Sequence, residues 1–122
     1  MSWSSRATVA DVSRGLEAAR SAGWWPRRSL MFHDLEALEA RLAALIDAFP
    51  SDAVHGIAIK ANPLVELLRV IVEAGGGLEA ASWEEVQCAL AAGCPPERLV
   101  FDSPAKTDEE LRDALALGAG IN

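Results

Sequence analysis

A lysine stands at the end of an apolar stretch, where a reactive amine is expected in an α/β protein. Residues 56–60 read Gly-Ile-Ala-Ile-Lys, which predicts a buried strand that ends at Lys60. Reactive groups of parallel α/β structures gather at the carboxyl ends of the strands. The apolar neighbours Val54, Ile57 and Ile59 disfavour an ammonium and favour the neutral amine, a nucleophile that can form a Schiff base. The alternative is a lysine that extends from a strand end into solvent.

Two carboxylates and a hydroxyl follow in the next predicted strand and turn. Glu79 lies near the start of that strand, and Ser82 and Glu85 lie at the start of the helix after it. We expect Glu79 and Glu85 to face Lys60 across the strand ends. Glu79 could also be an ordinary surface acid, and Glu85 could pair with Ser82 in a capping box. Lys106 lies in the next strand-to-helix loop; loops often carry functional residues, but an exposed lysine is also common there.

Other residues that could bind ions or phosphate do not form a recognisable pattern. His33 and His55 lie far apart without a third ligand at metal spacing, and Cys88 and Cys94 match no zinc motif. The glycines at 75–77 follow a predicted helix and precede a strand, whereas phosphate loops lead from a strand into a helix. We therefore predict no metal site, and two free thiols.

Short apolar stretches alternate with amphipathic ones along the chain. The predicted strands are 29–33, 54–60, 78–81, 98–101 and 119–122. Capping residues predict helix starts, and glycines with access to a left-handed backbone predict helix ends. The predicted starts are at Asp34, Asn62-Pro63, Ser82 and Thr107, and the ends at Gly75, Gly93 and Gly118. This alternation predicts a parallel sheet covered by helices. Residues 1–28 form a poorly specified lead-in with a weak helical pattern at 7–21.

Composition narrows the class of protein. The 122 residues carry 11 basic and 18 acidic side chains, a net charge of −7, and 51% are hydrophobic. This suffices for one folded domain and excludes a disordered chain. Without a long apolar run or a signal-like N-terminus we expect a cytoplasmic protein, and without a basic cluster we expect no nucleic-acid partner. On length alone an open doubly wound sheet fits, because a complete eight-stranded barrel needs about 200–250 residues.

Four motifs in series resemble one family. Residues 55–63, His-Gly-Ile-Ala-Ile-Lys-Ala-Asn-Pro, resemble the Lys-Ala-Asn-Pro signature of the fold-type III pyridoxal-phosphate-dependent decarboxylases, which act on diaminopimelate, ornithine and arginine. Gly-Leu-Glu-Ala-Ala-Ser at 77–82, Ala-Gly-Cys-Pro-Pro-Glu-Arg-Leu-Val-Phe at 92–101 and Ser-Pro-Ala-Lys-Thr at 103–107 follow in order. The resemblance covers 29–122. It implies roughly the first half of a (β/α)8 TIM barrel shared with alanine racemase, truncated before the remaining strands and a C-terminal β-domain.

The resemblance also implies roles for particular residues. Lys60 would form the internal aldimine with pyridoxal 5'-phosphate, and Glu79, Ser82 and Glu85 would lie at the cofactor; relatives usually carry Asp at position 79. The substrate would be an amino acid that loses its α-carboxylate, and the full-length protein would be a homodimer. The family's phosphate loop and its remaining site residues would lie outside this sequence. An amino-acid racemase of the same barrel and an inactive truncated half-barrel remain the alternatives.

Overall fold

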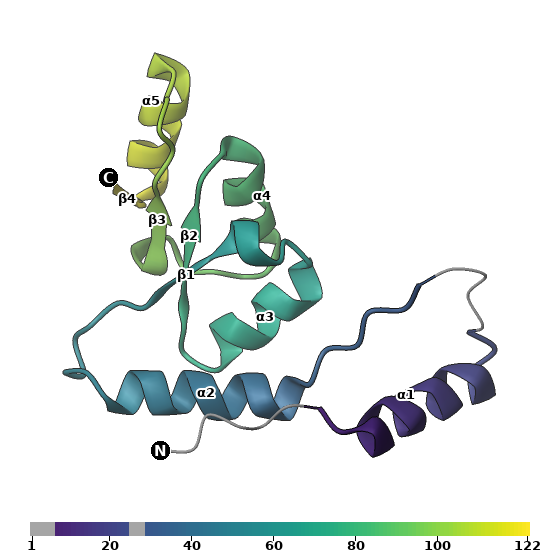
Figure 1. The fold of residues 1–122 in the computed structure, drawn as a ribbon. Helices are drawn as coiled ribbons and strands as arrows, with labels where there is room; N and C mark the ends of the chain where they lie inside the picture. Colours follow the sequence, from purple (N-terminus) through teal and green to yellow (C-terminus); the bar gives the residue numbers. More distant parts are fainter. Residues whose placement is uncertain (1–6, 25–28) are drawn as a thin grey trace. The chain divides into compact units, whose positions relative to one another are not determined.

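The computed structural model describes residues 7–24 and 29–122 (Figure 1). The chain divides into two compact units, Met1–Ala37 and Leu38–Asn122. In chain order the elements are α1 Val9–Ser21, α2 Leu35–Asp47, β1 Gly56–Ala58, η1 Ile59–Ala61, α3 Val65–Glu73, β2 Gly77–Ala80, α4 Trp83–Ala91, η2 Pro96–Arg98, β3 Leu99–Phe101, α5 Asp108–Leu117 and β4 Gly120–Ile121. Among the helices so described, none is long and apolar enough to span a membrane.

The first unit contains α1, which begins with a reciprocal cap. The Thr8 hydroxyl accepts from the Asp11 N–H, and the Asp11 carboxylate accepts from the Thr8 N–H at 2.7 Å. No residue of α1 is buried. The strand predicted at 29–33 is wrong, because a strand exists only through a ladder and these residues join none. The helix start predicted at Asp34 is confirmed, since its Oδ1 accepts from the Ala37 N–H at 2.9 Å.

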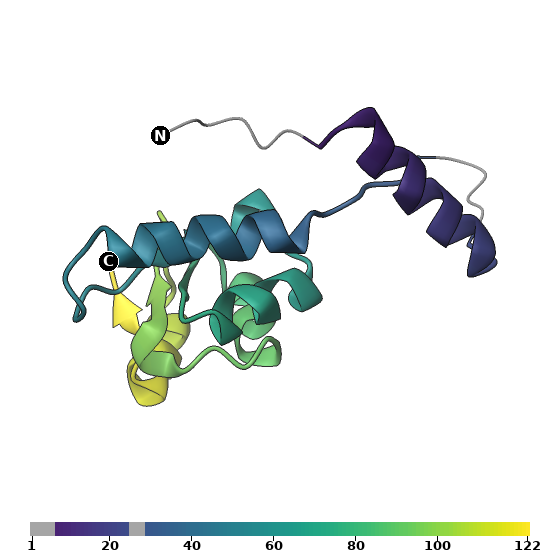
Figure 2. The same cartoon turned by 90° about the horizontal axis from the view of Figure 1, so that it is seen from below.

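The second unit is built on a four-stranded sheet. All three strand pairs are parallel, and the spatial order β1-β2-β3-β4 repeats the order in the chain (Figures 1 and 2). A doubly wound sheet reverses its strand order at a switch point, whereas a (β/α)8 barrel adds each strand beside the last. The strand order therefore confirms the expected partial barrel and excludes the open doubly wound sheet that length alone favours.

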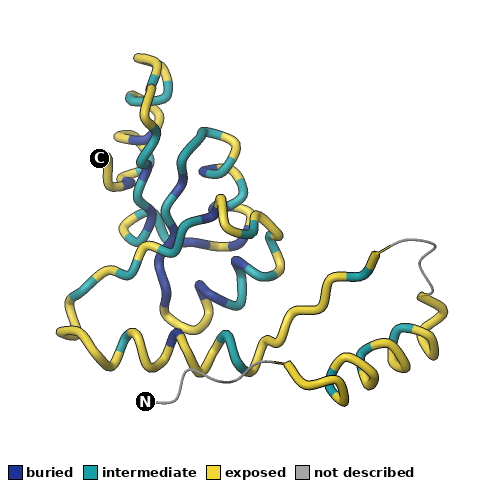
Figure 3. The backbone as a smooth tube through the Cα atoms, viewed as in Figure 1, coloured by how far each residue is buried: buried dark blue, intermediate teal, exposed yellow. Residues whose placement is uncertain are grey.

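Alternation along the strands gives the sheet two different faces. Leu78, Ala80, Leu99 and Phe101 are fully buried and join one core with apolar residues of α3, α4 and α5. Figure 3 shows this burial in the strands and in the facing sides of α3 and α4. Intervening side chains point to the opposite face of a strand. That face carries the half-buried row of Ala58, Glu79 and Val100, which are partners in the ladder register.

The helix ends follow the glycine prediction. Gly75, Gly93 and Gly118 all have φ between 82° and 94°, the left-handed region that only glycine adopts without strain. Gly118 is itself the C-cap of α5, and the other two directly follow the C-caps of α3 and α4. Each stop lets the chain turn back toward the next strand. The four strands predicted from residue 54 onward are present; β2 has the predicted length but begins one residue earlier, and the other three are shorter than predicted.

Helix starts agree less completely with the prediction. The Thr107 capping box is confirmed, since the Thr107 hydroxyl accepts from the Glu110 N–H while the Glu110 carboxylate accepts from the Thr107 N–H. The start at Asn62-Pro63 is wrong: α3 begins at Val65. Asn62 instead closes a local turn, with its Oδ1 accepting from the Leu64 N–H at 3.4 Å.

Candidate functional site

Lys60 and Glu79 meet at the carboxyl edge of the sheet. Lys60 lies in η1, two residues after the end of β1, and Glu79 belongs to the neighbouring β2, where it pairs in register with Ala58. The Lys60 Nζ lies 3.6 Å from the Glu79 Oε1, which makes an ion pair. The alternation of β2 turns Glu79 to the face opposite the packed helices, and the ion pair brings Lys60 to the same carboxylate. The predicted facing of these two residues is therefore observed.

The environment of Lys60 differs from the sequence expectation in two respects. Strand β1 ends at Ala58, and Lys60 lies in the 3-10 turn η1 instead of at a strand end. Its side chain is 62% exposed, so the expectation of an amine held away from water is wrong for this chain. The reason is directional: Ile59 is fully buried in the helix-facing core, and its neighbour Lys60 points elsewhere. The apolar residues beside Lys60 in sequence thus do not enclose its amine.

Glu79 carries an incompletely satisfied oxygen. Its side chain is 18% exposed, and its Oε1 is buried without a hydrogen-bond partner. Buried polar atoms of native proteins are almost always hydrogen-bonded, so an unpaired one requires an explanation. The Lys60 amine lies just beyond hydrogen-bond distance of this oxygen, at 3.6 Å. The pair therefore offers one amine accessible to a reagent beside one acceptor with unused capacity.

Ser82 and Glu85 hold the turn between β2 and α4. The Ser82 hydroxyl caps α4 by accepting from the Glu85 N–H at 3.3 Å. The Glu85 carboxylate accepts from the Ala81 N–H at 2.7 Å, not from the Ser82 N–H that a reciprocal capping box requires. The two side chains fix the backbone immediately after β2. Neither side chain forms a hydrogen bond or ion pair with Lys60, so the predicted facing of Glu85 and Lys60 is not observed.

Three further polar residues gather at the same edge, after β3 and β4. The Lys106 amine donates to the carbonyl oxygens of Ser103, at 2.7 Å, and Asn122. The Asn122 Nδ2 donates to the Asp102 Oδ1 at 3.2 Å. Sequence reasoning passed over Asp102 and Asn122, and it weighed Lys106 as a functional loop residue against an ordinary exposed lysine. The signal available was that Asp102 directly follows the strand predicted at 98–101 and that Asn122 ends the one predicted at 119–122.

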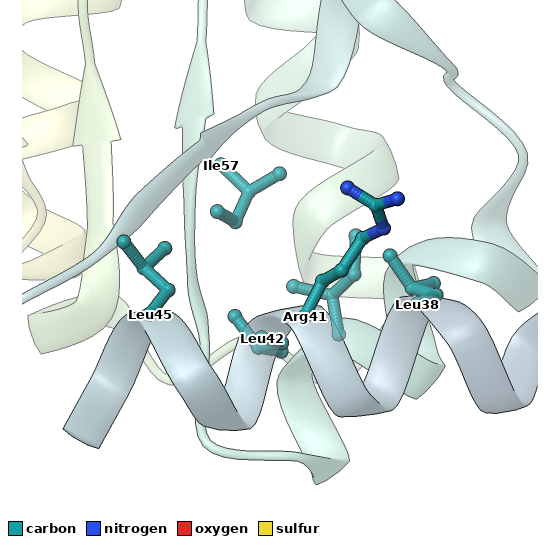
Figure 4. A pocket seen from close by; sticks show the side chains of 6 residues that line it. Leu38, Arg41, Leu42, Leu45 and Ile57 are labelled. Carbon is teal, nitrogen blue, oxygen red and sulfur yellow. The ribbon is translucent and has the colours of Figure 1, made fainter. Parts of the chain in front are cut away.

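An apolar hollow of about 150 Å³ lies elsewhere in the second unit, between α2, β1 and α3 (Figure 4). It is lined by Leu38, Arg41, Leu42, Leu45, Ile57 and Ile71. Ile57 pairs in register with the fully buried Leu78, so the hollow belongs to the helix-covered side of the sheet. None of the four predicted site residues lines it. The candidate chemistry therefore lies at the carboxyl edge and not in this hollow.

Comparison with known proteins matches most of the chain to one domain. Residues 35–121 match the family described as pyridoxal-dependent decarboxylase, pyridoxal binding domain. The diaminopimelate decarboxylase of Deinococcus radiodurans is 44% identical over 92 residues, which is 75% of this chain and 24% of that protein. The chain thus spans about a quarter of the length of this relative.

Solved structures agree with this assignment. Diaminopimelate decarboxylase from Helicobacter pylori, crystallised with L-lysine, superposes with a TM-score of 0.70 and 27% identity over 79% of this chain and 25% of that one. Lysine/ornithine decarboxylase from Vibrio vulnificus, crystallised with putrescine, gives a TM-score of 0.73 and 25% identity over 93% of this chain and 30% of that one. With a parallel sheet in barrel order and a lysine at its carboxyl edge, the chain belongs to the pyridoxal-dependent decarboxylases, through their pyridoxal-binding domain.

Proposed function

We propose that this chain is the first part of the cofactor-binding barrel of an amino-acid decarboxylase of the diaminopimelate type, and that Lys60 holds pyridoxal 5'-phosphate. The observation that carries the proposal is the accessible Lys60 amine beside the Glu79 carboxylate, at the edge where barrel enzymes place their reactive groups. The family match and the named function of the Deinococcus relative support the cofactor and the reaction class. An amino acid would be the substrate, and a homodimer in the cytoplasm the working form of the full-length protein.

The residues of the carboxyl edge fit this cofactor. A primary amine is the group that condenses with the aldehyde, and Lys60 presents one that is open to solvent. Glu79 would keep that amine at its edge of the sheet through the ion pair, and its unpaired Oε1 would accept one further hydrogen bond. Ser82 and Glu85 would act on the cofactor region by fixing the turn after β2.

Pyridoxal phosphate, when bound, supplies an electron sink for the pair of electrons left by a departing α-carboxylate. The work of the present residues is binding and orientation. Lys60 would retain the cofactor between turnovers and yield its place to the substrate amine. Glu79 would balance the charge of the Lys60 ammonium while that amine is displaced, since the two groups already form a pair.

The test is an absorbance titration of the 122-residue chain with pyridoxal phosphate. Lys60 and Lys106 are the two lysines of the sequence, which makes a matched pair of variants available. We expect wild type and Lys106→Arg to develop the visible band of a lysine-bound pyridoxal, with saturation. Lys60→Arg keeps the positive charge and removes the primary amine, so it should lose the saturable band. An equal band in Lys60→Arg, or none in wild type, would reject the proposal for Lys60.

A further inference from the structure

The second lysine of the chain occupies an unusually well-defined position. The Lys106 amine donates to the Ser103 carbonyl at 2.7 Å and to the Asn122 carbonyl. It also lies 5.3 Å from the centroid of the Phe101 ring, within the range of a cation–π contact. One half-buried side chain therefore contacts the end of β3, the loop after it and the residue that follows β4.

The Phe101 ring extends this contact toward the turn after β2. Phe101 is fully buried, and its ring meets the Trp83 ring edge-on, with centroids 5.9 Å apart and an interplanar angle of 72°. Trp83 is the first residue of α4 and directly follows Ser82. It packs against the same core that contains Ile59, the neighbour of Lys60. Contacts thus lead from Lys106 through Phe101 to Trp83 at the turn after β2, and Trp83 packs on the core that also contains Ile59.

Backbone hydrogen bonds join the ends of the strands at the same edge. The Asp102 N–H donates to the Ala80 carbonyl at 2.8 Å, which joins the ends of β2 and β3. The Asn122 N–H donates to the Phe101 carbonyl at 3.2 Å, which joins the ends of β3 and β4. These are the last bonds of a sheet whose strands are only two to four residues long. Because such short strands have few ladder hydrogen bonds, side-chain contacts at their ends contribute much to holding the strand ends in place.

We propose that Lys106 is a positioning residue that fixes the carboxyl edge of β2, β3 and β4, and through Phe101 and Trp83 the turn after β2. Its ammonium acts as a clamp on two backbone carbonyls and one aromatic face. The effect of Lys106 on a cofactor site rests on the proposed function, because that function places the cofactor at this edge. The clamp itself is a property of the chain without any ligand.

The test is native-state hydrogen exchange on wild type, Lys106→Met and Lys106→Arg. Methionine keeps the length and apolar volume but donates no hydrogen bond, whereas arginine keeps the charge and the donors. In Lys106→Met we expect the amides of Ala81, Asp102 and Asn122 to exchange about tenfold faster, which is the effect of losing one or two net hydrogen bonds. The Gly77 amide, bonded to the His55 carbonyl at the other end of β2, should keep its rate. Lys106→Arg should resemble wild type.

Unchanged rates at all three edge amides, or an equal acceleration at Gly77, would overturn the clamp. If Lys106→Met does not fold, Phe101→Leu serves instead, because it removes the ring contacts to Lys106 and Trp83 while retaining an apolar side chain. It should accelerate the Ala81 amide more than the Gly77 amide, and equal effects on the two would overturn the proposal.

A second readout concerns the site itself. The rate at which pyridoxal phosphate and borohydride modify Lys60 should fall about threefold in Lys106→Met and recover in Lys106→Arg, because a loosened edge presents the amine less uniformly. If Lys106→Met accelerates exchange of the edge amides but leaves the rate of Lys60 modification unchanged, the link to Lys60 is overturned and the clamp is retained. Failure of wild type to be modified would reject the proposed function, whereas the exchange result would still decide on Lys106.

Discussion

Removing the positive charge of Lys60 should destabilise the fold more than removing the negative charge of its partner Glu79. The Glu79 side chain is 18% exposed and has a buried, unpaired oxygen, whereas the Lys60 side chain is 62% exposed. Lys60→Met therefore leaves a largely buried carboxylate without its partner. Glu79→Gln leaves an ammonium that water can hydrate, and it removes the charge that is costly to bury. We expect Lys60→Met to be the more destabilising variant.

The magnitude follows from the separation of the charges. Two unit charges 3.6 Å apart interact by about 1 kcal/mol in water and about 4–5 kcal/mol at an effective dielectric of about 20. The exposure of Lys60 places the pair near the lower figure, and measured pairs of this kind contribute about 0.2–1 kcal/mol. We expect Lys60→Met to cost about 1 kcal/mol, Glu79→Gln less than about 0.5 kcal/mol, and the double variant to regain most of the loss.

Urea unfolding of the four proteins of this double-mutant cycle, followed by tryptophan fluorescence, measures the coupling between the two side chains. The coupling should be about 0.5–1 kcal/mol in 0.1 M salt and fall by half or more in 1 M salt. Lys60→Arg is the control that keeps the charge and should cost little. A coupling of zero, or a larger loss in Glu79→Gln than in Lys60→Met, would refute this description of the pair.

Three further predictions concern the fold. Leu78→Ala removes a fully buried side chain and should cost about 2–5 kcal/mol in urea unfolding, whereas Leu115→Ala, at a position 68% exposed, should change stability by less than about 0.5 kcal/mol. Burial raises the pKa of the Cys94 thiol, which disfavours the reactive thiolate. Iodoacetamide at pH 8 should therefore alkylate the half-buried Cys88 first, and Cys94 only after urea is added. Equal alkylation rates of the two thiols would contradict the packing around Cys94. Hydrogen bonds from Thr107 lower the pKa of the Glu110 carboxyl in the folded chain. The stability that Glu110 contributes is therefore complete above the ordinary pKa of 4.5 and is lost as the pH falls through the lowered folded value. Glu110→Gln should flatten that part of the curve of stability against pH.

Capping residues and glycines in the sequence predicted those helix ends that depend only on a few neighbouring residues. The Thr107 box and the left-handed Gly118 are confirmed because a cap satisfies backbone groups within one turn of itself. Asn62 was misassigned because an Asx turn and a helix cap use the same side chain. The strand at 29–33 failed for a different reason, since apolar residues in series do not create the ladder that a strand requires.

The meeting of Lys60 and Glu79 was predictable from the sequence, but the exposure of the Lys60 amine was not. Alternation and strand order bring Lys60 and Glu79 to one edge, and both properties can be inferred from the pattern and the family resemblance. Whether an amine is dry depends on what covers it, which is a non-local property. Ile59 illustrates the difficulty, because it is fully buried although its neighbour Lys60 is mostly exposed.

The most direct test of the central claim is to identify which amine takes up the cofactor. The wild-type chain is incubated with pyridoxal phosphate, reduced with borohydride, digested and analysed by peptide mass spectrometry. We expect modification mainly at Lys60, because Lys106 already donates to two backbone carbonyls. Modification mainly at Lys106 or at the N-terminal amine, or equal modification of all three, would contradict it.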